Sequence, residues 1–108
     1  MSEFKGTKGK WIADIRTGCC AVYPESRENY TNGCHNDDDR NIFYSSKGSN
    51  YNGNHWDIPD EEKANAILIS KAPEMLEMLK NILEQREYGR EYVSIENMKK
   101  LIKEATTI

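Results

Sequence analysis

The apolar and polar positions divide the chain into two parts near residues 56–59. Before that point the chain is rich in Gly, Asn and Ser and has short apolar runs, whereas after it the apolar residues recur with helical spacing. We therefore expect an α+β fold, in which a small N-terminal antiparallel β-sheet (a meander) packs against two or three C-terminal helices. At 108 residues there is room for a single domain, 1–108. We divide it into a flexible N-terminus at 1–9, a β-rich region at 10–58 and a helical region at 60–106.

Three short segments of the β-rich region have the character of strands. Residues 10–16 and 19–23 are joined by Thr17-Gly18, which suits a tight hairpin turn, and residues 41–46 form the third strand. Alternation in the first strand places on one face Trp11, Ala13 and Ile15.

Two features interrupt these strands. Pro24 ends the second strand, because proline cannot donate a backbone hydrogen bond to a ladder. Residues 47–55 contain two glycines and no aliphatic residue. We therefore expect a long loop there, and loops of that length are often functional.

Helix signals begin at Asp60, a good N-cap that is followed by two glutamates suited to the positive end of a helix. The core stripe expected for this helix is Ala64, Ile67, Leu68 and Ala72. The pair Ala72-Pro73 should break or kink the helix and open a second one, since proline fits the first turn.

The second and third helices carry the strongest apolar faces. The face of the second helix consists of Met75, Leu76, Met78, Leu79, Ile82 and Leu83. Gly89 is its expected stop, and Ser94 caps the third helix. The stripe of the third helix consists of Ile95, Met98, Leu101, Ile102 and Ala105. Because the methionines widen the second face beyond one sheet contact, we expect a homo-oligomer, a dimer or larger, through these helices.

Charge and targeting signals narrow the range of partners. The net charge is −3, which disfavours binding to duplex nucleic acid, and also to single strands. Residues 1–10 lack the apolar segment of a signal peptide, and no apolar run is long enough to span a membrane. The three cysteines are an odd number, so we expect reduced thiols in a cytoplasmic protein without a membrane partner.

Candidate metal and catalytic patterns are incomplete. A calcium loop starting at Asp37 would need Gly and Glu at positions that hold Ile42 and Gly48. The cysteines and histidines have no Cys-x-x-Cys spacing for zinc, so a strand cysteine such as Cys20 fits a small buried hydrophobe. The neighbours Cys34-His35 lack an orienting third residue. We expect no metal, no cofactor and no catalytic residue, and the pattern favours a binder over an enzyme.

The stretch 40–56 combines aromatic, cationic and amide side chains, with Arg16 able to join from a neighbouring strand. Aromatic faces stack on bases, Arg and Lys neutralise phosphates, and Asn can pair with base edges. The candidate ligand-binding residues are Arg16, Arg40, Tyr44, Lys47, Asn50, Tyr51, His55 and Trp56. The alternative is a polar loop with Trp56 packed under the first helix.

The segment 60–80 reads Asp-Glu-Glu-Lys-Ala-Asn-Ala-Ile-Leu-Ile-Ser-Lys-Ala-Pro-Glu-Met-Leu-Glu-Met-Leu-Lys. It resembles a recurring stretch of small phage and prophage accessory proteins, as does the C-terminal ending at 101–108, whereas the β-rich half resembles theirs in layout, beginning with Gly-Lys-Trp at 9–11. By layout the chain is also similar to the phage anti-defence "sponge" proteins of the Thoeris and CBASS type.

That resemblance implies an immune-evasion protein in the host bacterial cytoplasm. Such a protein binds and sequesters a small nucleotide signal, a cyclic ADP-ribose isomer or a cyclic oligonucleotide, without catalysis. The alternative is a protein-binding inhibitor of a host defence factor, similar to an anti-CRISPR protein, that acts through the acidic patches 37–39 and 60–62. A structural or regulatory phage protein without a ligand is a third interpretation.

Overall fold

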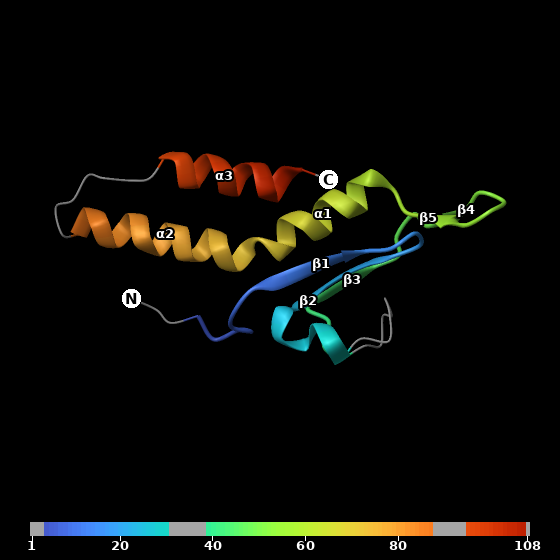
Figure 1. Cartoon of the computed structure of the whole chain (residues 1–108), viewed down its shortest axis with the longest axis horizontal. Coiled ribbons are helices and arrows are strands. Elements are labelled where there is room, and N and C mark those ends of the chain that lie inside the picture. Colours follow the sequence, from blue (N-terminus) through green and yellow to red (C-terminus); the bar gives the residue numbers. More distant parts are fainter. Residues whose placement is uncertain (1–3, 31–38, 88–94, 108) are drawn as a thin grey trace.

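The computed structural model describes residues 4–30, 39–87 and 95–107 of the chain. A three-stranded antiparallel sheet comes first, followed by a small hairpin and then by helices (Figure 1), which confirms the α+β expectation. The elements in chain order are β1 (Trp11–Ile15), β2 (Cys20–Pro24), the 3-10 helix η1 (Glu25–Tyr30), β3 (Phe43–Ser45), β4 (Asn50–Tyr51), β5 (Trp56–Asp57), α1 (Asp60–Ser70), α2 (Ala72–Glu87) and α3 (Ile95–Thr106).

The sheet has the strand order β1-β2-β3, and β2 ends at Pro24 as predicted. Ala13 lies opposite Val22, and Val22 lies opposite Phe43. The predicted alternation holds for Trp11, which packs with Phe43 and Val22 on the face that α1 covers, whereas Ile15 of the same predicted face is exposed. β2 is buried along its whole length, so the core of the protein is built around this central strand.

The helix α1 packs on the sheet with small and polar side chains and with Ile69. Its buried residues are Glu62, Ala66 and Ser70, and Ala66 belongs to a core cluster with Cys20, Val22 and Ile58. The predicted stripe of α1 is therefore wrong for the sheet contact: its member Leu68 is about half exposed and turns towards α2 and α3. A helix that lies close to a sheet needs small side chains at the contact, which the apolar spacing alone does not reveal.

The N-terminal end of α1 differs from the prediction, whereas the break that follows α1 agrees with it. Pro59 occupies the N-cap position, with no capping bond from a side chain, and its carbonyl accepts from the backbone N–H of Glu62 and Lys63. Asp60 is therefore the first helical residue and not the cap. The break at Ala72-Pro73 is confirmed, because α2 begins at Ala72. The expected stop at Gly89 and cap at Ser94 lie outside the described residues.

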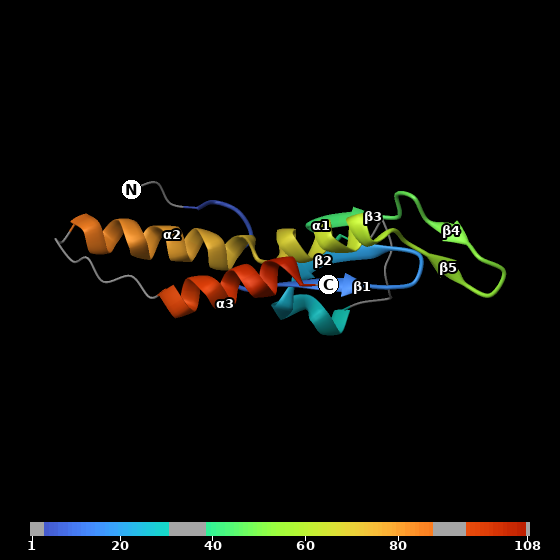
Figure 2. The ribbon, with the colours of Figure 1, turned by 90° about the horizontal axis from the view of Figure 1, so that it is seen from above.

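The molecule is elongated, with extents of 59 × 26 × 20 Å. Figures 1 and 2 show α2 and α3 side by side at one end and the β4–β5 hairpin at the other, with the sheet and α1 between them. Ala105 of α3 is buried against the rest of the fold. No helix in the described part of the chain is long and apolar enough to cross a membrane.

Candidate functional site

The expected long loop at 47–55 is wrong, because it contains the strand β4, which pairs with β5 in an antiparallel hairpin. The hairpin turn is organised by Asn52. Its side-chain Oδ1 accepts hydrogen bonds from the backbone N–H of Asn54 (3.0 Å) and of His55 (3.1 Å). Gly53 has φ 99°, a left-handed conformation that glycine adopts without strain. The amide and the glycine thus build a turn in a segment without aliphatic residues.

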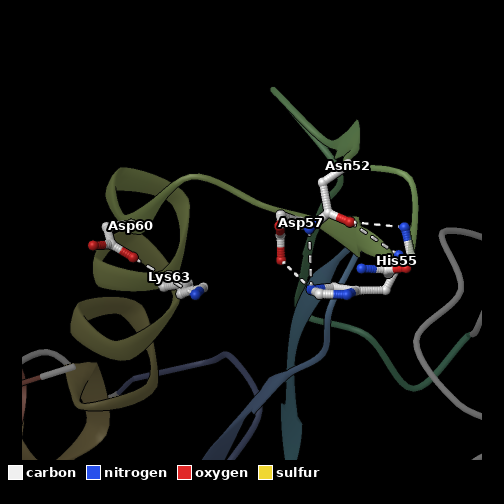
Figure 3. A network of polar contacts seen from close by, with 6 residues as sticks. Asn52, His55, Asp57, Asp60 and Lys63 are labelled. Carbon is white, nitrogen blue, oxygen red and sulfur yellow. Dashed lines mark hydrogen bonds and ion pairs between the residues drawn. The ribbon is translucent and has the colours of Figure 1, made fainter.

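Polar contacts between side chains hold the two strands of the hairpin together (Figure 3). The Nε2 atom of His55 lies 2.9 Å from Oδ1 of Asp57, and Nδ2 of Asn52 donates to Oδ2 of Asp57 at 2.6 Å. Both His55 and Asp57 are about half exposed. The hairpin therefore has a defined shape at the surface without a hydrophobic core of its own.

An aromatic pair lies across the hairpin. Tyr51 is the cross-strand neighbour of Trp56, and the ring centroids are 5.6 Å apart with 49° between the planes. Each of the two side chains is 54% exposed. The predicted alternative for Trp56, a position under the first helix, is therefore wrong. Tilted aromatic pairs of this kind are stabilising, and here they also present ring surface to solvent.

Close contacts fix the hairpin to the sheet. A Cβ atom on Gly18 would lie 2.9 Å from Cβ of Trp56, so the β1–β2 turn and β5 approach as closely as glycine permits. Gly48 approaches Pro59 in the same way, with 2.7 Å from its ideal Cβ position to the Pro59 Cγ. Two turns that are distant in sequence thus meet at one end of the molecule.

Arg16 lies at the base of the β1–β2 turn, where its backbone N–H donates to the carbonyl of Cys19. Its guanidinium donates to both carboxylate oxygens of Asp14, at 2.9 and 3.2 Å. Burial of Asp14 acts to raise its pKa, but the hydrogen bonds from Arg16 and Tyr23 outweigh it and the pKa lies below its ordinary value. Arg16 is thus held in one orientation by an ionised partner.

The structure brings together six of the eight predicted ligand-binding residues. Asn50, Tyr51, His55 and Trp56 belong to the hairpin, while Lys47 is exposed in the turn before it. We call the set of Arg16, Lys47, Asn50, Tyr51, His55 and Trp56 the hairpin end. Tyr44 is separate: it lies in the middle of β3 opposite Ala21, on the face of the sheet away from α1.

Arg40, the eighth predicted residue, is placed in the interior, where it is 4% exposed. Its guanidinium carbon lies 3.7 Å from the centre of the Tyr23 ring, and Nη1 donates to the backbone carbonyls of Arg27 and Glu28 at 3.4 Å each. Arg40 therefore joins η1 to the face of the sheet away from α1. The sequence gives no sign of this, because the residue sits in a polar stretch that reads as a surface segment.

Cys20 has a buried thiol with little tendency to ionise. Cys20 is fully buried, and its Sγ contacts the Glu62 carbonyl at 3.6 Å. Burial raises the pKa of Cys20 to about 11, with the nearby Glu62 adding to the effect. The prediction of a buried strand cysteine is confirmed for Cys20. Cys34 and His35 lie outside the described residues, and the described part holds no group of three potential metal-ligating side chains.

The described grooves lie away from the hairpin end, along the helices. One is lined by the N-terminal segment and α2, and a polar one lies between α2 and α3. A third, of about 410 Å³, runs between the apolar sides of α2 and α3. The hairpin end is by contrast a protruding surface, which suits stacking on an exposed ring more than enclosure of a ligand.

Residues 1–107 match the protein family described as Salmonella phage P22 protein Y8K6. The comparison with curated proteins gave no match, and the comparison with solved structures gave none either. The family match covers the β-rich region as well as the helices, so the expectation of a small phage protein is confirmed over nearly the whole chain. The chain belongs to the family of Salmonella phage P22 protein Y8K6.

Proposed function

We propose that this phage protein binds and sequesters a small nucleotide signal at the hairpin end, without catalysis and in the host bacterial cytoplasm. The ligand class is a cyclic ADP-ribose isomer or a cyclic oligonucleotide. The observation that carries the proposal is the half-exposed pair Tyr51 and Trp56. The pair is held at a protruding end by a polar network and by the close approach of Gly18 to the Trp56 side chain.

The aromatic pair supplies the recognition of a base. Stacking of a nucleobase on an aromatic side chain contributes about 1–3 kcal/mol, and any base offers a face for it. Tyr51 and Trp56 present ring surface on a hairpin whose strands are already paired, and such preorganisation lowers the entropy cost of association.

Cations for a phosphate lie near the same end of the molecule. Lys47 is exposed in the turn before β4, and Arg16 belongs to the turn that contacts Trp56 through Gly18. The Arg16 guanidinium is oriented by Asp14, so a phosphate would share this cation with the carboxylate. Asn50 at the start of β4 adds an amide that can pair with a base edge.

Calorimetric titration against cyclic ADP-ribose isomers and cyclic di- and trinucleotides tests the proposal. We expect Trp56→Ala to weaken binding about ten- to a hundredfold, the loss of one stacked ring. Asn54→Ala is the matched control, because the Asn54 side chain makes no described contact although it lies in the same turn. Absence of binding heat with every compound, for the wild-type chain, overturns the proposal.

A second candidate is inhibition of a host defence protein. The observation that favours it is that the exposed aromatic pair neighbours the acidic side chains of Asp57 and Asp60, which are 55% and 81% exposed. An aromatic anchor beside charges is typical of protein interfaces. The expected patch 60–62 is corrected in one member, since Glu62 is buried and accepts from Ser45 and Asn65. A stoichiometric partner that is lost in high salt and with Asp60→Lys would favour this candidate.

A further inference from the structure

Among the described residues, no part of the chain fully covers the helix α2. It has 16 residues, yet none of its side chains that the structure describes, at 72–85, is buried. Isolated helices of this length are marginal in water, because tertiary packing supplies most of the stability of a protein helix. A further contact on its exposed side would therefore add to the stability of the helix.

An apolar groove of about 410 Å³ runs between α2 and α3. Its lining carries no charged side chain; the members are Leu68, Met75, Met78, Leu79, Ile82, Met98, Leu101, Ile102, Ala105 and Thr106. Figures 1 and 2 show that α2 and α3 run side by side past the end of the sheet. Leu68 of α1 borders the groove, and the other lining residues belong to α2 and α3.

Apolar ridges stand beside the groove. Leu79 of α2 is 64% exposed and Ile102 of α3 is 63% exposed, and both also belong to the lining. Leu83 and Ile95 continue the two ridges along the helices. One face thus carries a groove and the ridges that would fill such a groove, which is the requirement for an isologous contact between identical surfaces.

The surface of the chain is large enough for such a contact. It exposes 7895 Å², whereas a compact monomer of 12.5 kDa exposes about 6,200 Å². The radius of gyration is 16.7 Å, against about 13 Å for a compact domain of this length. The exposed apolar side chains of α2 and α3 contribute to this excess, and a stable interface of standard size takes roughly 800 Å² from each partner.

We propose that two copies of the chain associate through the α2–α3 groove, with the ridge of Leu79 and Ile102 of each copy seated on the groove of the other. The two hairpin ends lie at the opposite end of each copy from this interface, so they stay exposed in the pair. This inference does not depend on the proposed function, because the interface and the hairpin end share no residue.

Sedimentation equilibrium of the full chain measures the copy number. We expect twice the 12.5 kDa mass of one chain, with dissociation on dilution. The double variant Leu79→Asp with Ile102→Asp should raise the dissociation constant of the pair at least about a hundredfold. The reason is that the introduced carboxylates of both copies would be buried in an apolar interface. Its folding is checked by cooperative thermal unfolding, which we expect to persist because both sites are exposed in one copy.

Asn81→Asp is the matched control, since Asn81 lies on α2 in the polar groove and away from the ridge. It adds a charge to the same helix and should leave the mass of the pair unchanged. A wild-type chain that sediments as one copy overturns the inference, and so does a pair that survives the double variant intact. A monomer that binds a host protein through Leu79 and Ile102 assigns the groove to another occupant and also overturns it.

Discussion

Trp56 packs against Gly18, with 2.9 Å between the tryptophan Cβ and the position that a Cβ of Gly18 would take. This contact joins β5 to the β1–β2 turn, 38 positions earlier in the chain. It places Arg16 and the aromatic pair at one end of the molecule, so the geometry of the hairpin end depends on a residue that has no side chain.

A side chain at position 18 should displace the hairpin. Gly18→Val would overlap the Trp56 side chain, and because the hairpin is at the surface it can move away. We expect a loss of free energy of unfolding of about 1 kcal/mol and a change in Trp56 fluorescence. Thr17→Ala, at an exposed neighbouring position, should change neither. Unaltered fluorescence of the valine variant would show that the contact does not position Trp56.

Removal of the Arg40 guanidinium should destabilise the fold. Arg40→Met retains much of the volume but loses the contact with the Tyr23 ring and leaves the carbonyls of Arg27 and Glu28 without this donor. We expect a loss of about 2–3 kcal/mol in chemical denaturation, measured by circular dichroism. A variant as stable as the wild type would contradict a structural role for the Arg40 guanidinium.

The stability of the protein should fall in acid partly through Asp14. Its pKa in the folded state lies below the ordinary 3.8, so near pH 4 the folded protein binds fewer protons than the unfolded chain. The stability that ionised Asp14 contributes is fully present at pH values above the ordinary pKa, and it is lost as the pH falls through the pKa of the folded state. Between pH 7 and pH 2 the free energy of unfolding, measured by chemical denaturation, should therefore fall less steeply for Asp14→Asn than for the wild type. An equally steep acid loss in the variant would assign the effect to other carboxylates.

The Cys20 thiol should resist alkylation in the folded protein. It is fully buried and its pKa is raised to about 11, so little thiolate forms near neutral pH. In a chain with Cys19→Ser and Cys34→Ser, iodoacetamide at pH 8 should react only as the protein unfolds, with a rate that follows denaturant concentration. Rapid labelling of the native variant would place the thiol at the surface.

The sequence predicts the sheet and helices well because their signals are local. The proline that ends β2 and the Ala72-Pro73 break act on their own segments, and the structure confirms both. The alternation of β1 holds for Trp11 but not for the exposed Ile15. The contact face of α1 is different: Glu62, Ala66 and Ser70 are selected by closeness to the sheet and not by apolar spacing. A tertiary contact therefore overrides the amphipathic pattern there.

The candidate site shows the same limit. The composition of 40–56 predicts ligand-binding residues in a loop and not a hairpin, because the side-chain contacts of Asn52 and Asp57 in this hairpin are not encoded by a hydrophobic pattern. Arg40 cannot be told from Lys47 by composition, although one is buried and the other exposed. What separates them is the Tyr23 ring, a partner from another strand.

The indole N–H resonances of the two tryptophans offer the most direct measurement of nucleotide binding at the hairpin end. Trp56 lies in the hairpin end, whereas Trp11 packs beside the core and donates to the Thr7 carbonyl, so it serves as an internal control. During titration with cyclic ADP-ribose isomers and cyclic oligonucleotides, the account predicts a saturable shift of the Trp56 resonance while that of Trp11 stays in place. A shift of Trp11 alone, or of neither resonance with any of the compounds, would contradict it.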